Sequence, residues 1–252
     1  ALIQLNSVWE SKKINHKRAE SFIKKASEER CDAIVFPEMF NTGFSMNISR
    51  IAEDENGETF KMLSKTAKKY SIYVIAGFPI KLSNEEKGRN IAAVFDRKGN
   101  VIAQYTKIHP FSFLKEDQYY LAGNNPVIFN IDKTPCSIFI CYDLRFPEIF
   151  RKVAKDVEVI FVIANWPSSR KDHWDTLLKA RAIENQCFVI GVNRTGIDGN
   201  GIKYHGSSLV YDPFGRKICY GNDKDEFLIC EFNPSETSQI RSSFPFLRDM
   251  RF

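Results

Sequence analysis

Short apolar runs recur along the whole chain, and polar segments separate them. The runs are rich in Val, Ile and Phe and are too short for most helices, so they predict β-strands. Strands are expected at 1–5, 33–36, 73–77, 91–96, 101–105, 137–141, 157–163, 188–192, 207–211 and 227–231. Between several of these runs, apolar residues recur every three to four positions, which predicts helices. Helices are expected at 15–29, 59–70, 147–155 and 172–185, and Pro147 suits the first turn of a helix.

Two polar turns separate neighbouring strand-like runs. Asp96-Arg97-Lys98-Gly99-Asn100 and Asp212-Pro213-Phe214-Gly215 contain turn-forming residues and predict β-hairpins. Strands that alternate with helices and also form hairpins predict a layered α/β fold with mixed sheets. No linker-like, repetitive or low-complexity segment interrupts the pattern, so we expect residues 1–252 to form a single domain. The Gly-rich segment 193–202 is expected to be a surface loop, and it lacks the spacing of a phosphate-binding loop.

Charge and hydropathy favour a soluble protein that binds neither nucleic acid nor membrane. The chain has 36 Lys and Arg against 31 Asp and Glu, a net charge of +5. Its densest basic cluster, within 12–25, is interrupted by Glu20 and carries no aromatic platform, so it indicates a solvated helix face. No apolar run approaches the roughly 18 residues that span a bilayer. No signal peptide is visible.

The cysteines indicate a reducing compartment. The six are Cys31, Cys136, Cys141, Cys187, Cys219 and Cys230. None is spaced as Cys-x-x-Cys, and four lie in or beside apolar runs, where free cysteine behaves as a small hydrophobic residue. We therefore expect a cytoplasmic protein. The histidines show no zinc-type spacing, so neither a metal site nor Cys–His chemistry is expected.

Three polar residues follow buried runs and are candidates for chemistry. Cys141 ends the apolar run 137–141, Glu38 follows 33–36, and Lys107 follows 101–105. Because binding crevices form at strand ends in α/β folds, a thiol, a carboxylate and an ammonium could converge there and support acyl transfer. Taken one at a time, each residue also has a structural explanation: a buried cysteine, a turn glutamate or a solvated lysine.

Three blocks that contain these residues resemble the signature blocks of the nitrilase superfamily of carbon–nitrogen hydrolases. They are Phe36-Pro37-Glu38, Tyr105-Thr106-Lys107-Ile108-His109 and Cys141-Tyr142-Asp143-Leu144-Arg145-Phe146-Pro147-Glu148. The resemblance continues through 164–167, 173–174, 180–186, 193–194 and 212–215, so it covers nearly the whole chain.

The resemblance implies a role for each residue. Glu38 matches the general base, Lys107 the catalytic lysine and Cys141 the nucleophile. Glu116, shortly before Ala122-Gly123, matches a second glutamate that positions the substrate amide or assists proton transfer, although it could also be a solvated loop carboxylate. The backbone N–H of Tyr142 would help Lys107 hold the oxyanion. The implied reaction passes through a thioester and requires no metal or organic cofactor.

The segments 36–46 and 165–170 resemble the bacterial omega-amidase branch of this superfamily. Such enzymes hydrolyse the terminal amide of small 2-oxo-dicarboxylic acid monoamides, such as 2-oxoglutaramate and 2-oxosuccinamate. The far carboxylate of such a substrate needs a cationic partner. Arg145 and Arg170 are the candidates, although Arg145 could instead pair with Glu148 or Asp143, and Arg170 could be exposed.

Aromatic residues near the blocks are candidates for the pocket walls. They are Phe40, Phe44, Tyr142 and Trp166, each of which could also be core packing. The alternatives are another C–N hydrolase of the superfamily, acting on aliphatic amides or N-carbamoyl amino acids, or a non-catalytic binding protein. By resemblance, the fold is a four-layer α-β-β-α sandwich of two mixed sheets flanked by helices. A homodimer through the helices at 147–155 and 172–185 is also implied.

Overall fold

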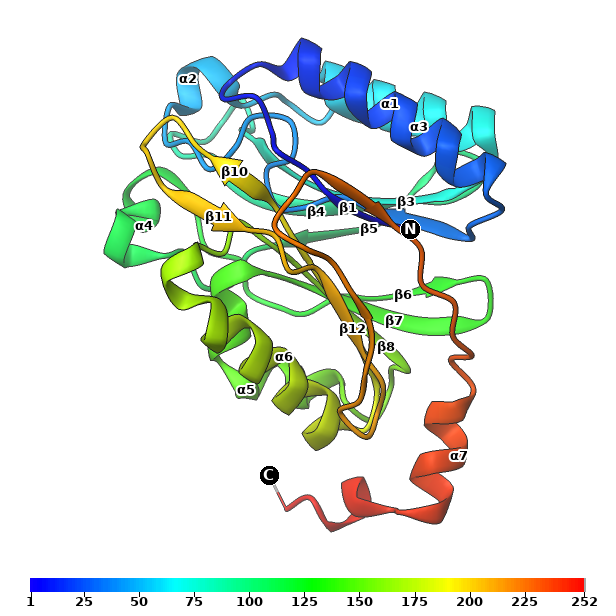
Figure 1. The fold of residues 1–252 in the computed structure, drawn as a ribbon. Helices are drawn as coiled ribbons and strands as arrows, with labels where there is room; N and C mark the ends of the chain where they lie inside the picture. Colours follow the sequence, from blue (N-terminus) through cyan, green and yellow to red (C-terminus); the bar gives the residue numbers. More distant parts are fainter. Residues whose placement is uncertain (252) are drawn as a thin grey trace.

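Two six-stranded sheets lie face to face, with helices on their outer sides (Figure 1). The computed structural model describes residues 1–251. In order across the first sheet, the strands are β14 (Glu226–Leu228), β1 (Leu2–Gln4), β2 (Ala33–Val35), β3 (Tyr73–Ile80), β4 (Arg89–Phe95) and β5 (Val101–Thr106). In order across the second, they are β13 (Lys217–Tyr220), β12 (Leu209–Tyr211), β9 (Phe188–Asn193), β8 (Val159–Ala164), β7 (Thr134–Ile140) and β6 (Ile128–Ile131).

Both sheets are mixed. Strands β1, β2 and β3 are parallel, as are β7, β8 and β9, and antiparallel strands flank each set. Every residue of β8 and β9 is buried, which is typical of parallel strands covered on both faces. The predicted strands and the layered mixed-sheet fold are confirmed.

Four helices cover the sheets. α1 (Lys12–Glu28) and α3 (Glu58–Tyr70) lie on the first sheet, and α5 (Pro147–Val153) and α6 (Lys171–Asn185) lie on the second (Figure 1). The shorter helices are α2 (Ile48–Ile51), α4 (Glu116–Tyr119) and α7 (Glu236–Ser243), and the 3-10 turns are η1 (Ser112–Leu114), η2 (Cys141–Arg145), η3 (Ser168–Arg170) and η4 (Phe246–Asp249). Ala19, Ile23 and Ala26 of α1 are buried at helical spacing, as predicted.

The two largest hydrophobic cores hold the layers together. One lies beneath α1 and α3, where Ile23 and Leu63 meet the outer face of the first sheet. The other joins the inner faces of both sheets and continues beneath α5 and α6. Because the sheets are packed inner face to inner face, loops at the same end of both sheets are brought into one region.

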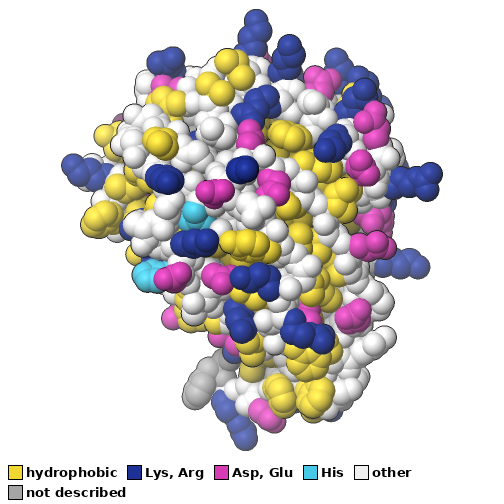
Figure 2. Space-filling model, in the orientation of Figure 1, with side chains coloured by type: hydrophobic (Ala, Val, Ile, Leu, Met, Phe, Trp, Pro, Cys, Tyr) yellow, Lys and Arg dark blue, Asp and Glu magenta, His cyan; other side chains and the backbone are white. Residues whose placement is uncertain are grey.

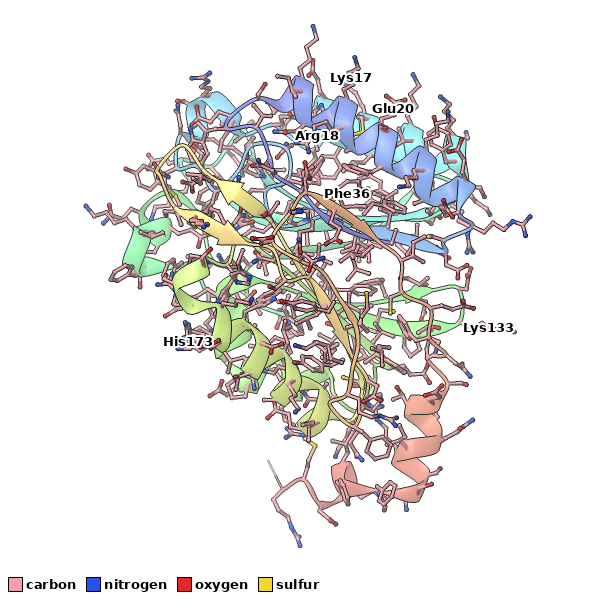
Figure 3. All side chains as sticks on the ribbon, viewed as in Figure 1. Lys17, Arg18, Glu20, Phe36, Lys133 and His173 are labelled. Carbon is pink, nitrogen blue, oxygen red and sulfur yellow. The ribbon has the colours of Figure 1, made fainter. Side chains whose placement is uncertain are left out.

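The outer face of α1 is solvated, as its sequence predicts. Lys17 and Glu20 are exposed and point away from the molecule, whereas Phe36 lies inside (Figure 3). Basic and acidic side chains are interspersed over this side of the molecule (Figure 2). Within residues 1–251, no helix combines the length and apolar character needed to cross a bilayer.

Both predicted hairpins form, whereas the expected surface loop at 193–202 is confirmed only for 198–202, which is a turn between two strands. The backbone of Asp96 pairs with that of Asn100 between β4 and β5, and Asp212 pairs with Arg216 between β12 and β13. Residues 193–197 instead complete β9 and form one arm of a small hairpin, β10 (Thr195–Ile197) with β11 (Lys203–His205). Asn193 and Arg194 are fully buried, because the first sheet packs over them.

Candidate active site

The candidate residues lie where strands of both sheets end. Cys141 directly follows β7, and Asn165 directly follows its parallel neighbour β8. In the first sheet, Glu38 lies just beyond β2, and Lys107 just beyond β5. Since the sheets face one another, these side chains meet at one end of the sandwich.

Glu38, Lys107 and Glu116 form one buried cluster. The Lys107 Nζ atom lies 3.0 Å from Glu38 Oε1 and 2.8 Å from Glu116 Oε2. All three side chains are almost completely inaccessible to solvent. Glu116, which could have been a solvated loop residue, begins α4 and points inward, and it also accepts the backbone N–H of Phe111 at 2.6 Å.

Two asparagines complete this cluster. Asn90 of β4 donates through Nδ2 to Glu38 Oε1 at 2.7 Å and to Glu116 Oε1 at 2.8 Å. Asn165 donates its backbone N–H to Glu38 Oε2 at 2.8 Å and its Nδ2 to the Glu38 backbone carbonyl at 2.8 Å. Sequence reasoning assigned neither residue a role. The available signal at Asn90 was only a polar residue directly before the apolar run 91–95.

Burial and charge together set the protonation of the cluster. Burial lowers the pKa of Lys107, but the charges of Glu116 and Glu38 outweigh it and hold that pKa well above its usual range. Burial also raises the pKa of Glu116, despite its contact with Lys107. The lysine is therefore firmly cationic.

Cys141 occupies a strained turn at the first residue of η2. Its φ is +48°, in the left-handed region that non-glycine residues seldom adopt. Burial, together with the charge of Glu38, raises the pKa of its thiol well above the usual range. The backbone N–H of Asn165 contacts both the sulfur and the Glu38 carboxylate. The resting sulfur is therefore a thiol, which needs a base before it can attack.

A cavity of about 190 Å³ opens onto Cys141 and Lys107. Six of its 15 lining residues are aromatic. The predicted residues that line it are Phe44, Tyr142, Trp166, Arg145 and Arg170, and Phe111, Phe113, Leu114, Asn165, Pro167, Ser169, Ile202 and Tyr204 complete it. The Tyr142 ring packs 4.8 Å from that of Phe111, which limits the width of the cavity.

Phe40 does not line this cavity, so its assignment as a pocket wall is wrong. Its ring is fully buried in the core beneath α1 and α3, 5.2 Å from the Phe36 ring. The turn after Glu38 causes this, because Met39 has φ +46° and the Phe40 N–H then donates to the Gly77 carbonyl of β3 at 2.9 Å. The chain returns to the cavity only at Phe44.

Arg145 and Arg170 present cationic groups to the cavity. Arg145 lies 5.0 Å from the Trp166 ring centroid and contacts His173 Nδ1 at 3.1 Å. Arg170 lies 5.5 Å from the Phe111 ring centroid. Within residues 1–251, neither forms an ion pair, so the alternative pairing of Arg145 with Glu148 or Asp143 is wrong.

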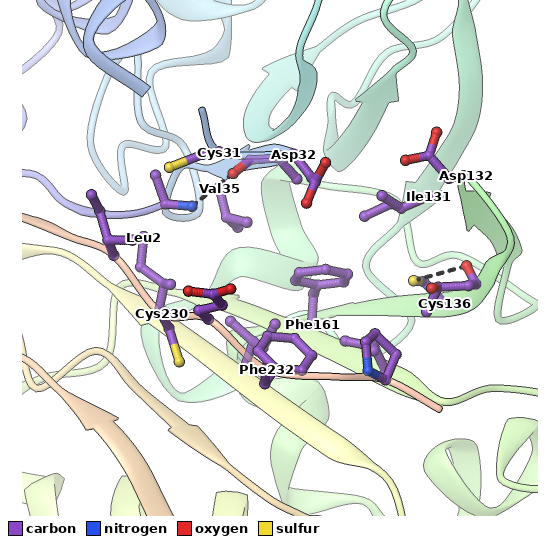
Figure 4. Close-up of a pocket in the computed structure, with 18 of the residues that line it drawn as sticks. Leu2, Cys31, Asp32, Val35, Ile131, Asp132, Cys136, Phe161, Cys230 and Phe232 are labelled. Carbon is purple, nitrogen blue, oxygen red and sulfur yellow. Dashed lines mark hydrogen bonds between the residues drawn. The ribbon is translucent and has the colours of Figure 1, made fainter. Parts of the chain in front are cut away.

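A second cavity is lined by none of the predicted site residues. This larger cavity, about 510 Å³, lies between the sheets where β2 and β8 begin (Figure 4). Leu2, Val35 and Phe161 contribute to its apolar lining. Across residues 1–251, no group of His, Cys, Asp and Glu has a geometry suited to a metal ion.

Known proteins that resemble this chain belong to a family of carbon–nitrogen hydrolases. The carbon-nitrogen hydrolase family matches residues 1–242. The chain is 38% identical over 239 residues to the 2-oxoglutaramate amidase of Bacillus subtilis, covering 94% of this chain and 91% of that protein. It is 35% identical over 221 residues to the omega-amidase YafV of Escherichia coli K12, covering 86% and 84% respectively.

The fold also matches a solved structure. XC1258 from Xanthomonas campestris, a CN-hydrolase superfamily protein crystallised with an arsenic adduct in its active site, superposes with a TM-score of 0.94 at 29% identity. The match covers 100% of this chain and 96% of that one. The expected four-layer fold and the family resemblance are therefore confirmed. The chain is a member of the carbon–nitrogen hydrolase family.

Proposed function

We propose that this enzyme hydrolyses the terminal amide of a small 2-oxo-dicarboxylic acid monoamide, of the 2-oxoglutaramate or 2-oxosuccinamate type, to the acid and ammonia. The observation that carries the proposal is the small, partly aromatic cavity, in which Cys141 and Lys107 meet two arginines that form no ion pair within residues 1–251. Relatives named 2-oxoglutaramate amidase and omega-amidase support the same substrate class.

In the first half of the reaction, the Cys141 sulfur attacks the amide carbon while Glu38 takes the thiol proton. Four contacts hold the Glu38 carboxylate, and the longest runs from Asn165 Nδ2 to Oε2 at 3.2 Å. We assign the proton to Oε2, because this contact is the weakest of the four. Glu38 then passes the proton to the leaving ammonia, and the C–N bond breaks to leave a thioester.

The oxyanion that forms during attack is held by Lys107. Two of its three ammonium hydrogens are directed to Glu38 and Glu116, so one is free to face the cavity. The backbone N–H of Tyr142 supplies the second donor. Loss of one donor of this kind costs about 10²–10³ in rate.

In the second half, water attacks the thioester carbon and Glu38 accepts its proton, which returns to sulfur as the acid leaves. Glu116 holds Lys107 and Asn90 in place and orients the substrate amide. No step requires a metal or an organic cofactor.

The far carboxylate of the substrate is assigned to Arg145 and Arg170. Each guanidinium is held over an aromatic ring and retains N–H groups for an incoming anion. The cavity volume of about 190 Å³ suits a compact substrate with one carboxylate beyond the amide.

Ammonia release from 2-oxoglutaramate tests the proposal. We expect saturable release, and a rise in KM of about tenfold or more in Arg170→Ala, with kcat changed much less. Strong release from an N-carbamoyl amino acid or from a simple aliphatic amide, with none from 2-oxoglutaramate, would assign the enzyme to another branch. No release from any amide, together with slow alkylation of Cys141, would favour a binding protein.

A homodimer through α5 and α6 accompanies this proposal. Ile183 on α6 is 47% exposed, and Phe214, next in sequence to Gly215, which packs against Ile183, is 49% exposed, so both contribute apolar surface. Light scattering of the purified protein, compared with Ile183→Lys, tests it, and a monomeric parent protein would refute it.

All six cysteines are free thiols, which supports a reducing, cytoplasmic location.

A further inference from the structure

A buried carboxylate, Asp143, links segments of the two sheets beside the proposed catalytic residues. Asp143 is completely inaccessible to solvent. Its Oδ2 accepts the Tyr105 hydroxyl at 2.7 Å and the Ile140 backbone N–H at 3.1 Å. Its Oδ1 contacts His109 twice, through the backbone N–H at 2.9 Å and through Nδ1 at 2.8 Å. Because the partner is a carboxylate, Nδ1 carries the proton in this contact.

The donors to Asp143 flank both proposed catalytic residues. Tyr105 and His109 lie two positions before and two positions after Lys107. Ile140 immediately precedes Cys141, and Asp143 itself lies two positions after it. Lys107 follows a strand of the first sheet and Cys141 a strand of the second, so Asp143 joins the two segments across the sandwich.

We propose that Asp143 is a positioning residue for hydrolysis, which holds the turn of Cys141 and the segment of Lys107 at a fixed separation through Tyr105 and His109. The proposal rests on the roles given above to Cys141 and Lys107. It does not depend on which amide is the substrate.

The strained backbone of Cys141 explains why such a link is needed. The left-handed conformation at φ +48° is unfavourable for cysteine and persists only where surrounding contacts enforce it. The bond from Asp143 to the Ile140 N–H closes the turn directly over Cys141. Without it, the sulfur would be free to relax away from the cavity.

The segment of Lys107, on the other side of Asp143, is also held by several contacts. The His109 ring stacks on Phe146, with centroids 3.8 Å apart and an interplanar angle of 11°. The Tyr105 hydroxyl also accepts the Ile108 N–H at 3.3 Å. Burial and the charge of Asp143 hold the pKa of Tyr105 well above its usual range, so the hydroxyl remains a donor. These contacts leave Lys107 little freedom to shift.

Two measurements test the proposal. The rate of iodoacetamide alkylation at Cys141, followed by peptide mass spectrometry, reports the sulfur directly and needs no substrate. Steady-state ammonia release then reports kcat and KM separately. The variants are Asp143→Asn, which replaces an acceptor with an amide donor, and Tyr105→Phe, which removes a single hydroxyl and is the milder change if Asp143→Asn folds poorly.

In Asp143→Asn we expect kcat to fall about 10²-fold, because a displacement of this kind misaligns reacting groups. KM should stay within about twofold, since Asp143 does not line the cavity. In Tyr105→Phe, loss of one hydrogen bond should lower kcat about fivefold to tenfold. Alkylation of Cys141 should also slow in both variants, and more in Asp143→Asn than in Tyr105→Phe.

Two controls separate positioning from general stability. Asp212→Asn alters another buried turn carboxylate, which accepts the backbone N–H groups of Phe214 and Arg216 far from the site, and it should leave alkylation and kcat unchanged. His109→Asn keeps a donor near the Nδ1 position and should retain much more activity than His109→Ala. Equal loss in both histidine variants would overturn the proposal.

Parent-like kcat and alkylation in folded Asp143→Asn and Tyr105→Phe would also overturn it. Failure of the substrate proposal gives a different result. The parent would then release no ammonia from 2-oxoglutaramate, while alkylation at Cys141 would still depend on Asp143.

Discussion

Lys107 is charged in a fully buried position because two carboxylates share it. A buried ammonium without partners would lose its proton or destabilise the fold. Glu38 and Glu116 contact it at 3.0 and 2.8 Å, and Asn90 bridges the two carboxylates on the other side. The cluster therefore fixes the orientation of Glu38 toward the cysteine.

At Cys141, removal of the sulfur should abolish turnover without loss of the fold. We expect Cys141→Ala to lower kcat by about 10⁴-fold or more, as for other nucleophiles that act with a base. Ammonia release and circular dichroism measure the two effects. Cys187→Ala, at a buried cysteine outside the cavity, should retain turnover. Activity in Cys141→Ala would refute the thioester mechanism.

His205 should make stability depend on pH. Burial, with the charge of Lys171, lowers its pKa to about 4 from 6.5, and within residues 1–251 neither ring nitrogen has a hydrogen-bond partner. Between these values the unfolded chain binds a proton that the folded chain does not. Stability should therefore fall as the pH decreases from 6.5 toward 4, by about 1.4 kcal/mol per pH unit.

Urea unfolding of His205→Leu checks this. The variant should lose stability less steeply than the parent over the same pH range. His173→Leu, at an exposed histidine, should keep the parent slope. A parent-like slope in His205→Leu would mean that His205 is protonated as readily in the folded protein as in the unfolded chain.

Among the elements, β3 determines where the Glu38 turn lies. A Cβ atom on Gly77 would stand 2.8 Å from the Glu38 Cα and 2.6 Å from Ile163 Cδ1, so only glycine allows the turn to approach. The same glycine accepts the Phe40 N–H through its carbonyl. The position of the base thus depends on a residue of the neighbouring strand.

Gly77→Ala should therefore displace Glu38. We expect a loss of about 1–3 kcal/mol in the free energy of unfolding from overpacking, and a fall in kcat of about tenfold to 10²-fold from misplacement. Ala76→Gly, in the same strand but buried in the outer core, should lower stability and leave kcat unchanged. Parent-like kcat in Gly77→Ala would show that the turn adjusts without moving the carboxylate.

The element-scale predictions succeeded where periodicity was strong and failed where it was weak. The runs that became β7, β8 and β9 and the helical spacing of α1 and α3 were sufficient to locate these elements. The short strands β10 and β11 lie in a Gly-rich segment that has no apolar periodicity. Their pairing depends on contacts with other parts of the chain, such as the bridge between Pro167 and Tyr204.

At the scale of the whole molecule, Arg241 of α7 binds the C-terminal segment, residues 236–251, to the loops beside α5, α6 and the second sheet. Its guanidinium donates to the carbonyls of Ala154, Val157, Asn185 and Gln186 at 2.8 to 3.1 Å. Arg241→Ala should lower the free energy of unfolding by about 2 kcal/mol, because charged hydrogen bonds are lost and carbonyls are left unpaired. Thermal unfolding measures this.

The activity of Arg241→Ala should be unchanged at temperatures where it is folded, since no residue of α7 lines the cavity. Arg248→Ala, at an exposed arginine of the same segment, serves as the control and should match the parent. If Arg241→Ala unfolded at the parent's temperature, the segment would contribute nothing to stability.

The sequence alone determined the alternation of strands and helices, the layered fold and the candidates Glu38, Lys107 and Cys141. Local patterns encode these features, because the periodicity of apolar residues and the identity of the residue after a strand can be recognised without knowing which residues are neighbours in space. The motif resemblance then added Glu116. Its charged neighbours in the sequence are equally typical of a solvated loop, but its side chain is buried.

Only the tertiary structure decided which side chains face the cavity. Asn90, Asn165 and Asp143 joined the site because distant segments place polar partners against them, and Phe40 left it because the turn after Glu38 directs its ring into the core. Whether a side chain is buried depends on the residues that pack over it, and for these four residues those lie far away in the sequence. A local sequence pattern therefore could not show which of them belong to the site.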